Sequence, residues 1–372
     1  MVRLSRALVG LAVIAALAVI VGAVIPRLTA RTDTAAIPGV IPSTVPPTTP
    51  LELPSAKGLN YGIPRAVGNT YVGTQWARSD TGVNDNWPAV RDALESDLAT
   101  VERYGLGKLV RLFIGLDQLM NWDSRTGYHG YNSTSLGNLD LAFDAFDRHG
   151  IKAIVVLYDQ EQLSSVGNFH FQALDGSHVT MRSNYLVATE DFMRRYEHRK
   201  TVVAWDLFNE AYNSLSTLGG LPMPPAVDPV SPGYAAATVQ RFLIDLYQAA
   251  KRGAPNAWLT VSDSTQLYRS SPDPSLYAGT LDFYDIHVYD NSPKFPDWKS
   301  RLTKPYLIGE AGASVAGESF KNQAFEVRAI SYILANAKSA GVRAVLVHSI
   351  VEDNVFNGNG LTPTGVLLAA SH

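Results

Sequence analysis

Two glutamates stand directly after apolar runs that are typical of buried strands. Glu210 follows Asn209 at the end of "TVVAWDLFNE" (201–210), and Glu310 lies within "PYLIGEAG" (305–312). A carboxylic acid and a carboxylate that face one cleft can divide acid–base and nucleophilic work, because their surroundings can separate their pKa values. Cleavage of a glycosidic bond requires this division. A lone glutamate after a strand is more often a capping or ion-paired group, so the argument depends on the pair.

Other polar side chains lie within or at the ends of similar apolar runs. They are Arg111, Tyr158, His287 and Tyr289. Taken alone, Arg111 could equally be a structural counter-ion or a functional residue. An isolated histidine is more often a hydrogen-bonded core residue. Whether these residues can act together depends on the strands and helices that position them.

The chain beyond residue 57 alternates between β-rich runs and amphipathic stretches. The β-rich runs span 58–63, 108–115, 152–159, 201–210, 257–263, 281–290, 305–312 and 343–350. The helical stretches span 88–105, 139–150, 184–200, 234–253 and 323–341. Nearly continuous apolar strands separated by helices indicate a parallel sheet that is covered on both faces.

Eight such strands predict an α/β fold of the (β/α)8 TIM-barrel type. A doubly wound sheet is the alternative, but no glycine fingerprint follows the first strand. In a (β/α)8 barrel, chemistry takes place at the C-terminal ends of the strands. Glu210 ends the fourth strand and Glu310 the seventh, so we expect them to face each other across the barrel mouth.

Composition excludes several other functions. The formal net charge of −3 gives no basic surface for nucleic acid. The chain has no cysteine, which rules out disulfides and thiolate metal sites. The eight histidines form no His-Glu-x-x-His motif and do not cluster as ligands. We therefore expect neither a metal nor another cofactor.

The N-terminus predicts export. An uninterrupted apolar stretch, 7–25, follows Arg3 and Arg6, so residues 1–31 are expected to form a signal peptide or a signal-anchor helix. Residues 32–56 are rich in Pro and Thr and predict a flexible linker. Residues 57–372 then form the barrel domain, which we expect to be a monomer outside the cytoplasm, membrane-anchored or secreted.

The segments "WDLFNEAYN" and "YLIGEAGAS" resemble the two active-site segments of clan A glycoside hydrolases, most like family 5, the cellulase and mannanase group. Arg111 in the second strand and His287-x-Tyr289 in the sixth strengthen the resemblance. It implies a retaining β-glycoside hydrolase that acts by double displacement on an extracellular or cell-envelope β-linked glycan. Glu210 would be the general acid/base and Glu310 the nucleophile.

The resemblance also implies roles for neighbouring residues. Asn209 would bind the sugar 2-hydroxyl, Arg111 and Tyr289 would keep Glu310 ionised, and His287 would line the cleft. Further substrate contacts are expected from Tyr158, Tyr212, Trp76 and Trp122. The eighth strand has no tryptophan in 344–356, which leaves the sugar, the linkage and endo or exo action open. The alternative is a non-catalytic carbohydrate-binding barrel of the same ancestry, which would be expected to lack one carboxylate.

Overall fold

The computed structural model describes a barrel unit and leaves parts of the chain undescribed. The described residues are 47–62, 82–123, 126–159, 179–211, 236–263, 267–268, 274–290, 293–313, 323–348, 354–357 and 360–371. All of them belong to one compact unit, Ile41–His372. The apolar N-terminal segment, Trp76 and Tyr212 lie outside these ranges, so the predictions made for them stay predictions. Within the described ranges, no helix is long and apolar enough to span a membrane.

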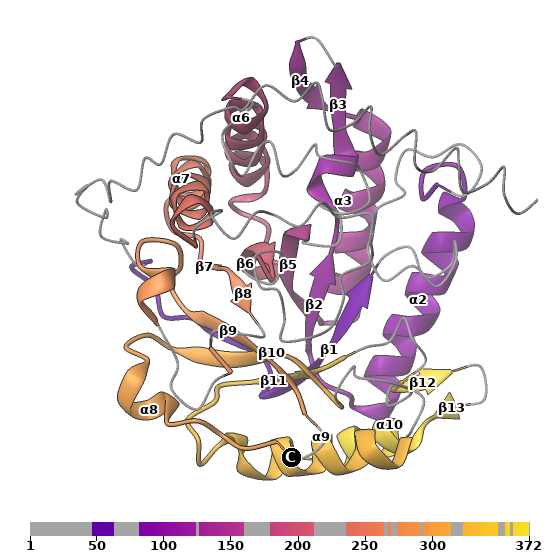
Figure 1. Cartoon of the computed structure of the whole chain (residues 1–372). Coiled ribbons are helices and arrows are strands. Elements are labelled where there is room, and N and C mark those ends of the chain that lie inside the picture. Colours follow the sequence, from indigo (N-terminus) through magenta and orange to yellow (C-terminus); the bar gives the residue numbers. More distant parts are fainter. Residues whose placement is uncertain are drawn as a thin grey trace, which may run out of the picture. The chain divides into compact units, whose positions relative to one another are not determined.

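Nine parallel strands form one sheet within the described ranges (Figure 1). They are β1 (Lys57–Gly62), β2 (Leu109–Phe113), β5 (Lys152–Asp159), β6 (Val202–Asn209), β7 (Leu259–Thr260), β8 (Ser262–Asp263), β9 (Tyr284–Tyr289), β10 (Tyr306–Gly312) and β11 (Val345–Val347). Their order is β7-β6-β5-β2-β1-β11-β10-β9-β8. Only Val261 separates β7, which pairs with β6, from β8, which pairs with β9. Since β7 and β8 are two halves of one strand, the sheet closes as the predicted eight-stranded barrel.

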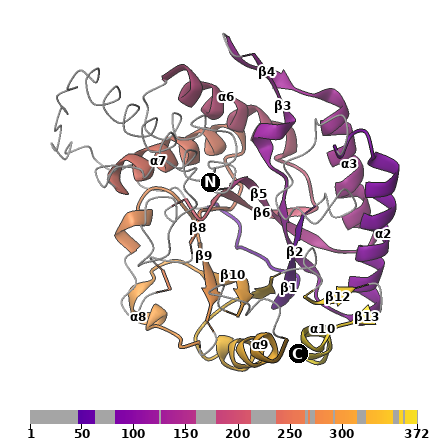
Figure 2. The same ribbon diagram turned by 45° about the vertical axis from the view of Figure 1, so that its right-hand side comes forward.

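Helices lie outside the strands (Figure 2). The longer ones are α2 (Trp87–Tyr104), α3 (Ser133–Arg148), α6 (Val179–Tyr196), α7 (Ala236–Gly253), α9 (Gln323–Ala337) and α10 (Pro363–Ala370). Short helices occur at η2 (Leu116–Leu119), η3 (Pro274–Tyr277) and α8 (Trp298–Arg301). Helix α2 shows why they pack there: Val90, Leu94, Leu98 and Val101 form one buried stripe at helical spacing.

Two hairpins and α10 were not predicted. The antiparallel pairs are β3 (Met120–Asp123) with β4 (Gly127–Tyr131), and β12 (Phe356–Asn357) with β13 (Gly360–Leu361). Their strands have two to five residues, which is too short for a hydrophobic period to be recognised.

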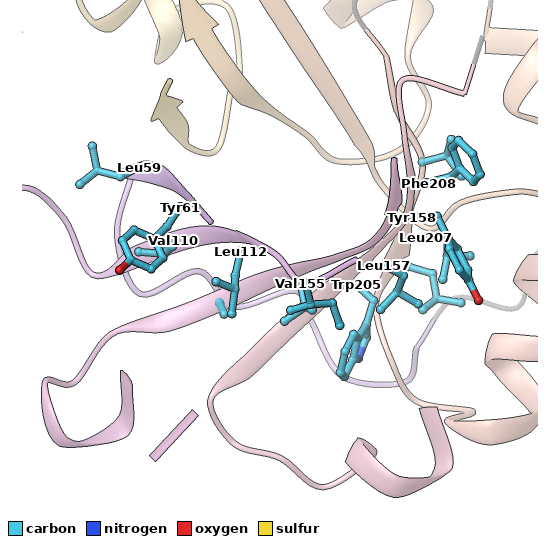
Figure 3. Close-up of a cluster of buried hydrophobic side chains, with 14 of the residues drawn as sticks. Leu59, Tyr61, Val110, Leu112, Val155, Leu157, Tyr158, Trp205, Leu207 and Phe208 are labelled. Carbon is cyan, nitrogen blue, oxygen red and sulfur yellow. The ribbon is translucent and has the colours of Figure 1, made fainter. Parts of the chain in front are cut away.

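The barrel has an outer and an inner apolar layer. Figure 3 shows side chains of the outer layer, including Leu59, Val110 and Leu157. The inner layer is a separate cluster to which most barrel strands contribute from their N-terminal ends. Its members are Leu51, Leu109, Ile154, Ala204, Phe283, Leu307, Ala344 and Leu346. This apolar filling leaves only the C-terminal half of the barrel interior for polar residues.

Residues 47–56, predicted as the end of the flexible linker, instead pack against the N-terminal end of the barrel. Leu51 is 4% exposed and belongs to the inner cluster. Its carbonyl accepts a hydrogen bond from Arg343 Nη1 at 3.3 Å, and the Thr49 carbonyl accepts one from Trp258 Nε1 at 3.0 Å. Leu51 thus ties this end of the predicted linker to the barrel, while most of residues 47–56 are exposed.

We expect Leu51→Ala to lower the free energy of unfolding by about 2 kcal/mol, because it removes a buried side chain that closes the inner cluster. Urea unfolding of the full chain measures this effect. Glu52→Ala, at the exposed neighbouring position, serves as the control and should change stability little. Equal stabilities of the two variants would contradict the packing of this segment.

Candidate active site

Arg111 of β2 is the central cation of the barrel interior. Its side chain is fully buried, and its guanidinium contacts three carboxylates. Nη1 donates to Glu310 Oε1 at 2.5 Å, Nη2 donates to Asp206 Oδ2 at 2.5 Å, and Nε lies 3.3 Å from Asp285 Oδ2. A buried charge is tolerated only when it is paired. Arg111 therefore fixes the positions of these three acids, and they fix its own.

The same guanidinium orients Asn209. Its Nη2 also donates to Asn209 Oδ1 at 2.6 Å, and Ser262 Oγ donates to the same oxygen at 3.1 Å. Asn209 Nδ2 donates to Asp159 Oδ2 at 2.8 Å. Because the oxygen faces donors and the nitrogen faces a carboxylate, only one orientation of the amide satisfies all partners.

A local irregularity of β6 brings Asn209 to Arg111. Side chains of a regular strand alternate between faces, so Asp206 and Asn209, three residues apart, would point to opposite sides. Both contact Arg111 Nη2. Asp206 Oδ1 also accepts a hydrogen bond from the Phe208 backbone N–H at 3.2 Å.

Glu210 follows in a left-handed backbone conformation. Its φ is 51°, and it is the one non-glycine residue with positive φ in the described ranges. Its N–H donates to the Ser262 carbonyl at 3.1 Å. Such conformations cost free energy and cluster at functional sites. Here the turn directs the Glu210 carboxylate toward His287, whose Nδ1 lies 2.8 Å from Glu210 Oε1.

A bulge in β10 places Glu310 beside the same histidine. Ile308 pairs with Ile286 and Glu310 with His287, so Gly309 is an extra residue in β10. The Gly309 carbonyl accepts a hydrogen bond from Asn60 Nδ2 at 2.8 Å. Without the bulge, alternation would turn Glu310 away from the barrel interior.

The surroundings of Glu310 keep it ionised. Oε1 accepts from Arg111, and Oε2 accepts from the Tyr289 hydroxyl. Burial alone would raise the pKa of Glu310, but His287, Arg111, His348 and the Tyr289 hydroxyl together lower that pKa to about 2. Glu310 is therefore a carboxylate throughout the neutral range.

His287 joins the two glutamates. It is fully buried, and its Nδ1 lies 3.5 Å from Glu310 Oε2 as well as close to Glu210. Burial lowers the pKa of His287, but Glu310 and Glu210 outweigh it and raise that pKa to about 9. One ligand-type atom from each of His287, Glu210 and Glu310 lies within 4.8 Å of the others. Since Arg111 and Tyr289 already donate to Glu310, this is an arrangement of charge-assisted hydrogen bonds and not of open metal ligands.

The structure thus brings together six of the residues named from the sequence: Arg111, Asn209, Glu210, His287, Tyr289 and Glu310. Tyr158 is not. Its hydroxyl hydrogen-bonds Thr189 Oγ1 of α6 at 3.1 Å, and its ring is buried with Phe208 in the outer layer (Figure 3). The predicted substrate contact for Tyr158 is therefore wrong. Trp122 is half-buried with its ring 6.1 Å from that of Tyr185, and its role stays a prediction.

Several buried polar residues of the site were missed. They are Asn60, Asp206, Ser262 and Asp285, whereas Asp159 was expected at the end of the third strand. Asp285 stands two residues before His287, so strand alternation alone could have placed it on the same face. Asp206 was not predicted to share a face with Asn209, because side chains three residues apart point to opposite sides of a regular strand.

We expect the protein to lose stability above pH 6.5 through His287. A raised folded-state pKa means that the contribution of His287 is complete below its unfolded value of about 6.5 and is lost as the pH rises through about 9. The loss amounts to at most about 3 kcal/mol. Urea unfolding at about pH 6 and about pH 10 should show a smaller decrease for His287→Asn than for the unmodified chain.

His198→Asn is the control for this measurement, because its side chain is 92% exposed. It should retain the full decrease. Identical decreases in all three proteins would show that His287 is not stabilised in its charged form.

Comparison with known proteins finds a relative by sequence and solved structures with a similar fold. No protein-family model matches the chain. A mannan endo-1,4-beta-mannosidase from Mytilus edulis is 24% identical over 276 residues, which cover 63% of this chain and 74% of that protein. The solved beta-mannanase from the same mussel has a TM-score of 0.57 at 19% identity, covering 80% of this chain and 90% of that one.

Two further solved structures share the fold. The beta-1,4-D-mannanase from Cryptopygus antarcticus has a TM-score of 0.56 at 18% identity, covering 85% of this chain and 90% of that one. The GH5_18 protein from Streptomyces cattleya, in complex with GlcNAc, has a TM-score of 0.57 at 16% identity, covering 86% and 80%. These solved structures show that the chain has the predicted barrel fold, and the mussel relative supports the resemblance to clan A glycoside hydrolases, most like family 5.

Proposed function

We propose that the chain is a retaining β-glycoside hydrolase in which Glu210 is the general acid/base and Glu310 the nucleophile. The observation that carries the proposal is the ionised Glu310, held by Arg111 and Tyr289, with a carboxylate oxygen within 4.8 Å of one from Glu210. Retaining enzymes separate their carboxyl groups by about 5–5.5 Å, whereas inverting enzymes need about 6.5–9.5 Å for an intervening water. The short separation favours a covalent intermediate.

The reaction proceeds in two displacements. In the first, Glu210 gives its proton to the glycosidic oxygen, and an oxygen of Glu310 forms a bond to the anomeric carbon as the leaving alcohol departs. In the second, Glu210 takes a proton from water, which attacks the same carbon and releases Glu310 as a carboxylate. His287 is hydrogen-bonded to Glu210 and stabilises its charge between these steps.

Asn209 contributes to substrate binding. Its Oδ1 is held by Arg111 and Ser262 and its Nδ2 by Asp159. An amide nitrogen carries two hydrogens, so the second can donate to the sugar 2-hydroxyl beside Glu310. A hydrogen bond at this hydroxyl strengthens in the oxocarbenium-like transition state.

The relatives support a choice of substrate class. The curated relative is a mannan endo-1,4-beta-mannosidase, and the solved structures from Mytilus edulis and Cryptopygus antarcticus are mannanases. β-1,4-Mannosides are therefore the first substrates to test, within the wider class of extracellular or cell-envelope β-linked glycans. The apolar segment 7–25 supports a location outside the cytoplasm, membrane-anchored or secreted. A non-catalytic binding barrel is disfavoured because both carboxylates are present and contact His287.

Glu310→Gln should lower kcat/KM on β-mannan or aryl β-mannoside by at least about 10³-fold, because it removes the nucleophile. Hydrolysis rates across a panel of polysaccharides and aryl glycosides measure this. Glu102→Gln, at a side chain that is 62% exposed, is the matched control and should keep full activity. Unchanged activity of Glu310→Gln would reject the assignment, and an inactive unmodified chain would favour the binding barrel.

The first product formed should keep the β configuration, because double displacement inverts the anomeric carbon twice. ¹H NMR of the anomeric protons during early hydrolysis distinguishes the outcomes. A mechanism-based fluoroglycoside should label Glu310, which mass spectrometry of peptides can locate. Initial release of the α anomer, or a label on another residue, would overturn the double displacement.

A further inference from the structure

A third carboxylate lies behind the two glutamates. Asp285 of β9 is fully buried, and its Oδ1 lies 3.8 Å from His287 Nε2. The opposite ring nitrogen, Nδ1, faces Glu210 and Glu310. The histidine therefore stands between one acid on its inner side and two acids on its outer side. The reaction described above makes no use of Asp285.

The space for Asp285 comes from the bulge in β10. A Cβ atom at position 309 would lie 1.7 Å from Asp285 Oδ1 and 2.4 Å from its Cγ. Only glycine can occupy this position while the aspartate stays in place. Gly309 is also the extra residue that turns Glu310 inward. One bulge thus accommodates the inner acid and positions an outer one.

Charged groups from four strands face Asp285. Arg111 of β2 lies 3.3 Å away, His287 is on its own strand, Asp206 lies on β6 and Glu310 on β10. Burial raises the pKa of Asp285 to about 6, against the opposing effects of Arg111 and His287. Electrostatic coupling is reciprocal, so a group that lowers the pKa of Asp285 has its own cationic form stabilised by Asp285.

We propose that Asp285 is a positioning residue that holds His287 in its doubly protonated form against Glu210 and Glu310. The contact of Asp285 with the Arg111 guanidinium does not by itself explain why Asp285 is there, because Asp206 and Glu310 already pair with Arg111. Asp285 adds a counter-charge on the Nε2 side of the ring. The cationic ring then keeps a proton on Nδ1, directed at the carboxylates.

This role matters for catalysis only if the proposed function is correct. Glu210 becomes negatively charged when it gives its proton to the leaving group. A cationic His287 at 2.8 Å stabilises that charge. Asp285 would thus set the upper limit of the pH range in which the acid/base can complete its cycle.

Asp285→Asn tests the proposal by a measurement that needs no activity. The titration of His287 is followed by NMR in the full chain labelled at histidine, with His287→Asn used to assign the signal. We expect the titration midpoint of His287 to fall by at least about one pH unit in Asp285→Asn. Asp92→Asn, at a side chain that is 71% exposed, should leave the midpoint unchanged. An unchanged midpoint in Asp285→Asn would overturn the proposal.

Activity provides the second measurement. In Asp285→Asn, the alkaline limb of the pH profile of kcat should move to lower pH by as much as the His287 titration midpoint does. KM should stay nearly constant. A uniform loss of kcat at every pH, without a change in the His287 midpoint, would indicate a merely structural role. If the unmodified chain is inactive, the proposed function fails while the NMR result still decides this inference. Asp285→Ser, which also removes the charge, replaces Asp285→Asn if the amide variant does not fold.

Discussion

The site depends on one buried cation. The Arg111 guanidinium lies inside the barrel with no exposed surface, where an unpaired charge would be prohibitively costly. Glu310 and Asp206 are its hydrogen-bonded counter-ions, Asp285 lies against its Nε, and Asn209, Asn60 and Ser262 accept its remaining hydrogens. These residues come from β1, β2, β6, β8, β9 and β10, so satisfying one charge aligns six strands. The geometry needed for chemistry and the geometry needed to bury an arginine are therefore the same.

A regular barrel would not produce this arrangement. Alternation allows side chains of one strand to face the interior only at every second position. Between Asp206 and Asn209 the side chains of β6 depart from alternation, since both contact Arg111, and the bulge at Gly309 shifts the phase of β10 just before Glu310. Glu210 then takes the left-handed φ of 51°. The two carboxylates converge because both strands depart from regularity near their C-terminal ends.

The regular part of the molecule is what the sequence predicts well. Apolar runs of strand length, with helices between them, were enough for the eight strands and for the barrel ends at which Asn209, Glu210 and Glu310 lie. The place of Asp206 in the site and the packing of residues 47–56 could not be predicted from these apolar runs. In β6 the side chains depart from alternation between Asp206 and Asn209, and the packing of residues 47–56 depends on an apolar cluster that Leu51 forms with distant strands. The substrate contact predicted for Tyr158 is not seen for a related reason. A tyrosine at the end of a strand can turn toward the helix layer, and here Tyr158 hydrogen-bonds Thr189.

The division of the barrel interior explains how the charged site remains stable. Leu109, Ile154 and their neighbours fill the N-terminal half with apolar side chains, while the acids, Arg111 and His287 occupy the C-terminal half. Within the polar half, Glu310 titrates near pH 2 and His287 near pH 9. Asp285, with a pKa raised to about 6, titrates between them. Above that value and below the titration of His287, Arg111 and His287 are both cationic, and Glu310 and Asp285 are both anionic. The carboxylates of Glu310, Asp206 and Asp285 lie against Arg111, and His287 lies beside Glu310, so groups of opposite charge surround the ionised nucleophile.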